Sequence, residues 1–158
     1  MRKVFWFFLA ISLFAITSCH KTDYYGGSWS FLGNTYSALG CSGGIGGILN
    51  ASNTNNNNLL TYGSIECNFY NVLPTTGGKF YVVAYPPKAA NQLSIAITID
   101  GSNAITYAST GGNNMDTVEV SVNAKSGYVT VQGNGIEMIN KSGGTDSSSL
   151  SLDLTQTQ

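Results

Sequence analysis

Large aliphatic residues alternate with small or polar ones from Leu93 to Ile99, where the sequence reads LSIAITI. Successive side chains of an extended strand point to opposite faces, so this period of two predicts a strand with one buried face and one solvated face. The same alternation recurs in residues 118–123, 129–132 and 149–154. A helical bundle, whose apolar residues repeat with a period of 3.6, is therefore excluded in favour of a sheet.

Turn-forming residues separate these segments from shorter strands. Gly33-Asn34, Asp100-Gly101 and Gly133-Asn134-Gly135 are typical of tight turns between antiparallel strands. The shorter strands are expected at residues 28–32, 35–39, 64–70, 104–107 and 136–139. Many short strands predict an all-β fold, a single antiparallel β-sandwich of about eight to ten strands. We favour the sandwich over a closed barrel because strand lengths are not uniform and no glycine kink repeats.

Two segments depart from the alternating pattern. Residues 80–85 are apolar at every position, so we expect a central strand covered on both faces and ended by Pro86 and Pro87. Residues 42–58 contain the sequence GGIGG followed by a run of asparagines, which predicts a long mobile loop.

The first residues combine a basic start with a short apolar run. Arg2 and Lys3 precede 13 nearly unbroken apolar residues, 4–16, whereas a helix that crosses a bilayer needs about 20. Such a run is typical of a secretory signal. It ends in Ile16-Thr17-Ser18-Cys19, which resembles the lipobox of bacterial lipoprotein signals. This resemblance implies that residues 1–18 are removed and that Cys19 receives a diacylglycerol on its sulfur and an acyl chain such as palmitate on its amine.

The lipobox divides the chain into a signal (1–18), a lipidated tether (19–27) and a β-sandwich domain (28–158). The alternative is an ordinary signal peptide followed by a chance cysteine. Two or more acyl chains on one residue anchor a protein stably, so we expect a lipid-anchored protein of the outer membrane or cell envelope. The residues after Cys19 carry one acid and one lysine, and the choice between the periplasmic and the surface face stays open.

The charge balance argues against a nucleic-acid partner. The chain has seven basic and eight acidic residues, and loss of Arg2 and Lys3 with the signal makes it more negative. A nucleic-acid-binding domain instead presents a basic face. The expected partners are the membrane, through the lipid on Cys19, and either a glycan or another envelope protein.

Cys41 and Cys67 remain once Cys19 is lipidated. An exported domain folds in an oxidising compartment, so the even number predicts one disulfide between them. The alternative is a pair of free buried thiols. A redox-active pair is not expected, because the Cys-x-x-Cys spacing is missing.

The chain has a single histidine, which excludes most catalytic mechanisms that require this residue. The single one, His20, follows the lipid anchor, so neither a Ser-His-Asp mechanism nor a histidine-based zinc site can be assembled. No phosphate-loop, dinucleotide or calcium-loop motif is present, and we expect no catalytic residue, metal or cofactor. A glycan hydrolase needs only two carboxylates, which leaves a different-class alternative. The candidate acids are Glu66, Asp100, Asp116, Glu119 and Glu137, and we favour solvated surface charges for all of them.

Aromatic residues and one short motif allow two readings each. We expect Trp29, Phe31, Tyr81 and Tyr85 to pack in the core, although exposed aromatic rings on a sheet could instead stack on sugars. Asp116-Thr117-Val118 resembles the O-glycosylation acceptor of exported Bacteroidota-type proteins, whereas Thr117 could simply open a strand.

Residues 27–37 combine a Trp-x-Phe strand, a glycine turn and a Thr-Tyr strand. They resemble the opening of small uncharacterised β-sandwich lipoproteins of Bacteroidota-type bacteria, and residues 127–131 with 135–138 fit the same pattern. The resemblance implies a lipoprotein with a sandwich-like domain and assigns no activity. We therefore predict a non-enzymatic binding or assembly module, with a glycan-binding surface lipoprotein as the alternative.

Overall fold

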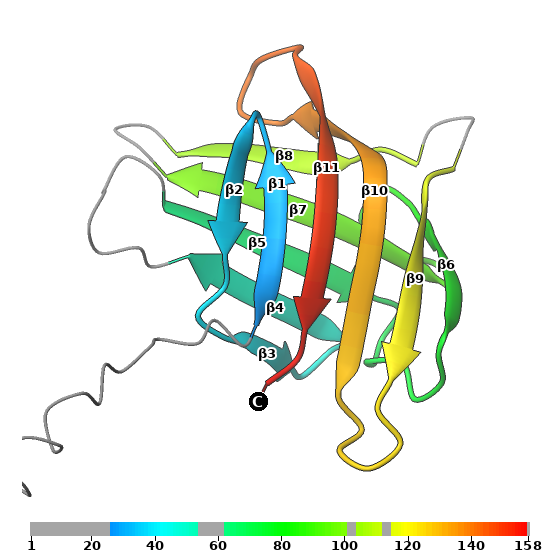
Figure 1. The fold of residues 1–158 in the computed structure, drawn as a ribbon. Helices are drawn as coiled ribbons and strands as arrows, with labels where there is room; N and C mark the ends of the chain where they lie inside the picture. Colours follow the sequence, from blue (N-terminus) through cyan, green and yellow to red (C-terminus); the bar gives the residue numbers. More distant parts are fainter. Residues whose placement is uncertain (1–25, 54–61, 101–103, 112–114, 158) are drawn as a thin grey trace, which may run out of the picture.

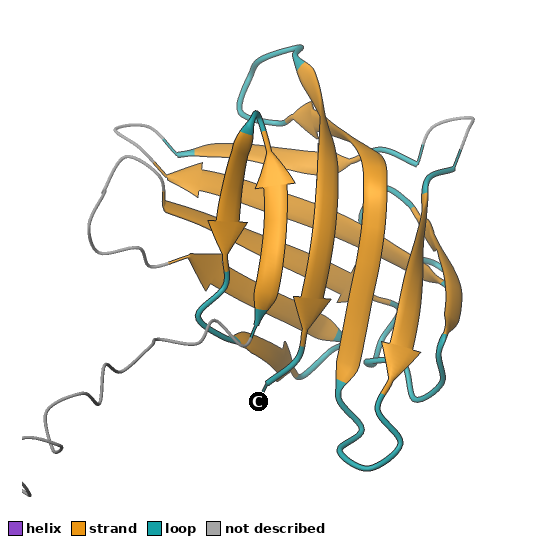
Figure 2. Ribbon diagram, viewed as in Figure 1, coloured by secondary structure: helices purple, strands orange, loops and turns teal. Residues whose placement is uncertain are grey.

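The computed structural model describes residues 26–53, 62–100, 104–111 and 115–157, and within them every regular element is a strand (Figures 1 and 2). Eleven strands form one mixed, mostly antiparallel sheet. They are β1 (Gly27–Phe31), β2 (Asn34–Ser37), β3 (Cys41–Gly44), β4 (Ile48–Asn53), β5 (Tyr62–Phe69), β6 (Gly78–Val82), β7 (Gln92–Asp100), β8 (Ile105–Ser109), β9 (Thr117–Val122), β10 (Val129–Asn140) and β11 (Ser147–Thr155). The all-β prediction is confirmed. No described segment is a helix of the length and apolarity that spanning a membrane requires.

The sheet folds over on itself into two layers (Figure 1). The first layer holds β2, β1, β11, β10 and β9, and the second holds β8, β7, β5, β4 and β3. Strand β10 belongs to both, because residues 129–132 pair with β9 and residues 138–140 pair with β8. Strand β6 joins the layers again, antiparallel to β9 and parallel to β7. Our prediction of an antiparallel fold of about eight to ten strands is therefore confirmed for most of the sheet, but it missed one strand and the parallel pairing of β6 with β7.

Strand β10 runs through a segment in which we predicted a turn. Its register against β11 advances from Gly133↔Leu152 to Ile136↔Leu150, so three steps on β10 oppose two on β11. Gly135 takes up the extra residue with a φ of 74°. A glycine in the left-handed region suits a β-bulge as well as a turn, and sequence alone does not separate the two.

The predicted mobile loop at 42–58 contains two strands. β3 and β4 form a hairpin whose connecting residues include Gly46 and Gly47, both at positive φ (84° and 79°). The glycines thus build a tight connection rather than a long loop. Residues 54–58 of the predicted loop lie outside the described residues.

The core fills the space between the layers. The Trp29 and Tyr36 rings of the first layer stack with centroids 5.2 Å apart and planes 8° apart. They lie on Gly63 of β5, where an added Cβ would come within 2.9 Å of the Tyr36 ring. Phe31 meets Tyr107 of β8 edge to face at 4.9 Å. The contact of the stacked rings with Gly63 and the contact of Phe31 with Tyr107 join strands that are far apart in the sequence. The burial of Trp29 and Phe31 confirms the core positions predicted for them.

The apolar segment 80–85 is not a central strand covered on both faces. Strand β6 ends at Val82, and within it Phe80 and Val82 are buried whereas Tyr81 is 37 % exposed. Tyr85, beyond the strand, is 73 % exposed. No layer covers the outer side of β6 in the described structure, so the core positions predicted for Tyr81 and Tyr85 were wrong.

Candidate functional site

The segment after β6 crosses to the outer face of the second layer. Its peptide bond between Tyr85 and Pro86 is cis, and the two prolines cannot continue a strand ladder. The Ser109 hydroxyl holds the start of this segment, because it donates to the Val83 carbonyl at 2.7 Å and accepts from the Ile95 amide at 2.9 Å. The Val83 amide also donates to the Leu93 carbonyl. Tyr85 is therefore exposed on a segment whose base is held by the sheet.

Strand β5 supplies the polar groups beneath this segment. Its residues 65, 67 and 69 are buried in the core, so Glu66 and Asn68 point to the outer face. The Asn68 side-chain amide donates to Glu66 Oε1 at 2.7 Å. Asn68 is only 9 % exposed although it lies on the outer face, and it lines the same depressions as Tyr85.

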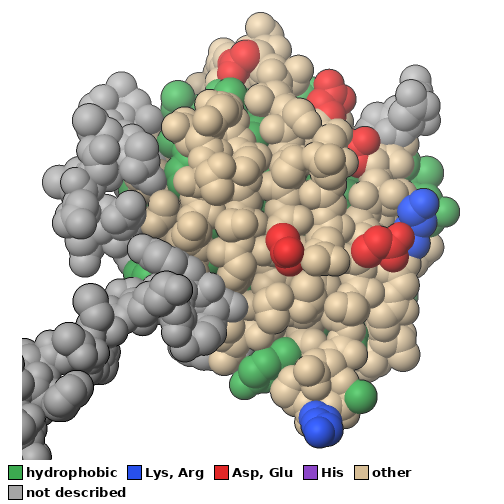
Figure 3. Space-filling model, viewed as in Figure 1, with side chains coloured by type: hydrophobic (Ala, Val, Ile, Leu, Met, Phe, Trp, Pro, Cys, Tyr) green, Lys and Arg blue, Asp and Glu red, His purple; other side chains and the backbone are tan. Residues whose placement is uncertain are grey.

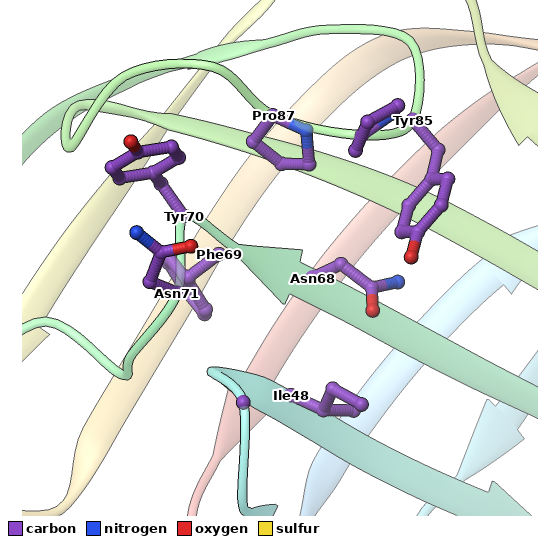
Figure 4. A pocket seen from close by; sticks show the side chains of 9 residues that line it. Ile48, Asn68, Phe69, Tyr70, Asn71, Tyr85 and Pro87 are labelled. Atoms are coloured by element: carbon purple, nitrogen blue, oxygen red, sulfur yellow. The ribbon is translucent and has the colours of Figure 1, made fainter.

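Two adjacent depressions share Asn68 and Tyr85, and we call them together the Tyr85 groove. Figure 4 shows the side chains that line the outer one. The inner depression has a volume of about 240 Å³ and is lined by Glu66, Asn68, Tyr85, Ser94, Ile95, Ala96, Ala108 and Ser109. The outer depression has a volume of about 290 Å³ and is lined by Gly46, Ile48, Asn68, Phe69, Tyr70, Asn71, Tyr85, Pro86 and Pro87. In Figure 4 the side chains of Tyr85, Asn68 and Ile48 converge on the same space.

The groove combines an apolar wall with a few polar groups. Glu66 is the only charged residue among those that line it, and no histidine, lysine or arginine does so. Ser94 is 2 % exposed and lines the inner depression. Apolar walls with a small number of placed polar groups are typical of ligand sites.

The outer face of the first layer is different in character. Figure 3 shows a broad surface of neutral polar groups with few charges. Its hydroxyls pair with each other across strands, as Ser30 does with Thr35 at 3.0 Å and Thr130 with Thr155 at 3.1 Å. Because these groups already satisfy one another, the Tyr85 groove is the better candidate site.

The structure does not gather the acids that we considered for hydrolysis in the Tyr85 groove, although it brings Asp116 and Glu137 into contact. Glu66 lies in the groove, Glu119 lies on β9 opposite Lys79, and the Asp116 carboxylate accepts from the Glu137 amide at 2.7 Å. Asp100 ends β7, and its side chain lies outside what the structure describes. Neither depression of the groove holds two carboxylates, so a hydrolase that uses a carboxylate pair gains no support from this site.

The two cysteines lie on opposite sides of β4. Cys41 pairs with Ala51 and Cys67 pairs with Leu49, so one strand separates them. Two strand spacings of about 4.8 Å, together with a register offset of two residues, put their Cα atoms more than about 10 Å apart, beyond the reach of a disulfide. Both thiols are free and buried, and the disulfide that we predicted is not present. Burial raises the pKa of the Cys41 thiol to about 12, and burial with the nearby Cys41 raises the pKa of Cys67 further.

Other predicted sites have mixed outcomes. Cys19 and His20 lie outside the described residues, so lipidation stays a prediction. Thr117 is half-buried at the start of β9, and its glycosylation also stays a prediction. No group of three histidine, cysteine or acidic residues suited to a metal ion occurs in the part of the chain that the structure describes.

Sequence reasoning missed the groove itself. Tyr70, Asn68 and Ser94 carried no motif, and Tyr85 was placed in the core. The one available signal was the Pro86-Pro87 pair, which cannot continue a strand ladder and so indicates that Tyr85 lies where the chain leaves the sheet.

No protein-family model, curated protein or solved structure matches this chain.

Proposed function

We propose that this chain is a lipid-anchored protein of the bacterial cell envelope. Its domain is a β-sandwich made from one folded sheet, and it binds a ligand in the Tyr85 groove. The observation that carries the binding role is an aromatic side chain, 73 % exposed, that stands over a hydrogen-bonded pair of polar side chains. An exposed aromatic ring on a soluble domain has a hydration cost that contact with a ligand would remove.

The membrane attachment rests on the sequence. Ile16-Thr17-Ser18-Cys19 matches the lipobox at all four positions, and the first strand begins at Gly27. Eight residues from Cys19 to Gly27 reach at most about 25–30 Å, so the domain would stay close to the lipid surface. We place the anchor in the outer membrane or another envelope membrane.

Binding is favoured over catalysis by the content of the groove. Its single carboxylate lacks a second acid or base among the residues that line the site. General acid–base hydrolysis of a glycosidic bond requires two such groups at a defined separation. A recognition role needs only shape and hydrogen-bonding groups.

Two measurements test the proposal. Metabolic labelling with a fatty acid should mark the native chain and leave the Cys19→Ala variant unmarked. A photo-crosslinking residue in place of Tyr85 should capture a cellular partner, whereas the same residue in place of Tyr128, a tyrosine 38 % exposed next to β10, should not. An unlabelled native chain would overturn the anchor, and equal capture from both positions would overturn the site.

A further inference from the structure

We propose that the Tyr85 groove binds a neutral oligosaccharide, with one pyranose ring in each depression and the Tyr85 ring as the stacking surface between them. This inference rests on the proposed binding function of the same groove and names the class of ligand.

Stacking is the first part of the argument. The face of an aromatic ring is electron-rich, so it attracts the weakly positive C–H groups on the flat side of a pyranose. Tyr85 lines both depressions and is 73 % exposed, so ring surface is available to a ligand. The hydrogen bond from Ser109 to Val83 holds the base of its segment, which reduces the entropy lost when a ligand binds.

Hydrogen bonding is the second part. Asn68 orients the Glu66 carboxylate through one of its two oxygens, and a carboxylate can accept further hydrogen bonds. Bonds from hydroxyls to a charged acceptor are about twice as strong as neutral ones. A sugar offers several hydroxyl donors close together. Ser94 lines the same depression and adds a hydroxyl that can donate or accept.

Charge and size narrow the ligand class. Glu66 is the only charged residue that lines these two depressions, whereas Lys88 lines a neighbouring depression that shares Tyr85 and Pro86. A uronic or sialic acid beside Glu66 would therefore meet charge repulsion. The depressions, about 240 and 290 Å³, fall below the range of about 300–1,000 Å³ typical of pockets for drug-sized ligands and cofactors. Each depression suits one ring. Since both share Tyr85 and Asn68, consecutive rings of one chain could occupy both.

The test is a calorimetric titration in which oligosaccharides are added to the full lipidated chain in detergent micelles. The probes are cellohexaose, maltohexaose and chitohexaose, with a galacturonic acid hexamer as the acidic comparison. At least one neutral hexamer should bind more tightly than the acidic one. Tyr85→Ala should weaken that binding about tenfold or more, equivalent to about 1.4 kcal/mol, and Tyr85→Trp should retain it.

The matched control is Tyr128→Ala, which removes another partly exposed tyrosine away from the groove and should leave binding unchanged. Glu66→Gln should weaken binding of the neutral hexamer and reduce the difference in affinity between the neutral and the acidic hexamer. The substitution removes the negative charge and keeps the shape of the side chain. Unchanged thermal unfolding of each variant shows that the fold persists.

Three results would overturn the inference: no binding of any neutral hexamer, tighter binding of the acidic hexamer, or an equal loss in Tyr128→Ala. Failure of the proposed function looks different. Capture of a protein without a glycan at position 85 would leave the binding groove intact and overturn only the ligand class. Hexamer binding by a chain that incorporates no fatty acid would overturn only the anchor.

Discussion

The Tyr107 hydroxyl donates a 2.7 Å hydrogen bond to the Asp146 carboxylate and thereby ties β8 to the segment before β11. Asp146 also accepts from the Asn140 side-chain amide at 2.8 Å. The hydrogen bonds from Tyr107 and then from Asn140 lower the pKa of Asp146. The hydrogen bond to Asp146, with burial and the negative charge of the carboxylate, raises the pKa of Tyr107.

These shifts predict that acid and base each reduce the stability of the fold. The lowered pKa of Asp146 stabilises the fold above the ordinary aspartate pKa of about 4, and this contribution is lost as the pH falls through the folded-state value. The raised pKa of Tyr107 stabilises the fold below about pH 10, and this contribution is lost as the pH rises through its folded-state value.

Tyr107→Phe should therefore flatten the dependence of unfolding on pH at both ends while retaining the ring that meets Phe31. The urea midpoint, measured from about pH 2 to 5 and again above about pH 9, checks this. Tyr128→Phe is the control, because Tyr128 is partly exposed and should follow the native profile. Identical slopes for native protein and Tyr107→Phe would contradict the assignment.

Gly63→Ala should destabilise the domain by about 1–3 kcal/mol, because the added methyl group overpacks the core against the stacked Trp29 and Tyr36 rings. Chemical denaturation followed by tryptophan fluorescence measures the loss, since Trp29 is the only tryptophan outside residues 1–18. Ser64→Ala, on the outer face of the same strand, should change stability by no more than about 0.5 kcal/mol. Equal stability of both variants would show that the aromatic stack adjusts to the methyl group.

Both core cysteines should resist alkylation in the folded domain at pH 8. Cys41 and Cys67 are buried, and a Cys41 pKa of about 12 leaves almost no thiolate to react. In denaturant without a reductant, mass spectrometry should show that both residues are alkylated. If both residues were alkylated only after a reductant is added, the two cysteines would form a disulfide, contrary to what the strand register indicates.

Ser109→Ala should destabilise the domain by about 1–3 kcal/mol, because the buried Ile95 amide loses its acceptor and the Val83 carbonyl loses a donor. Amide hydrogen exchange at Ile95 should accelerate more than exchange at Ile97, the next inward-facing residue of β7. Ser121→Ala, at an exposed serine of β9, is the control. Unchanged exchange at Ile95 would show that the Ser109 hydroxyl does not hold this position.

Local patterns predicted several strands well. The alternating residues of β7, β9 and β11 bury the side chains that the period of two assigned to the core, among them Ile97, Val120 and Leu152. Patterns built on glycine were less informative, since glycines at positive φ serve turns, hairpins and bulges alike. Gly135 was read as part of a turn and lies in a bulge of β10.

What the sequence determined by itself was therefore the strand class of the chain and the inward face of its most regular strands, because side-chain alternation is a local property of an extended backbone. The tertiary structure decided which outer faces are covered. The exposure of Tyr85 could not be predicted from its neighbours in the sequence. It depends on the path of the chain after β6 and on the outer face of β5. The groove joins Glu66, Tyr85 and Ala108 from three distant segments, and the pairing of β5, β6 and β8 with β7 brings those segments together.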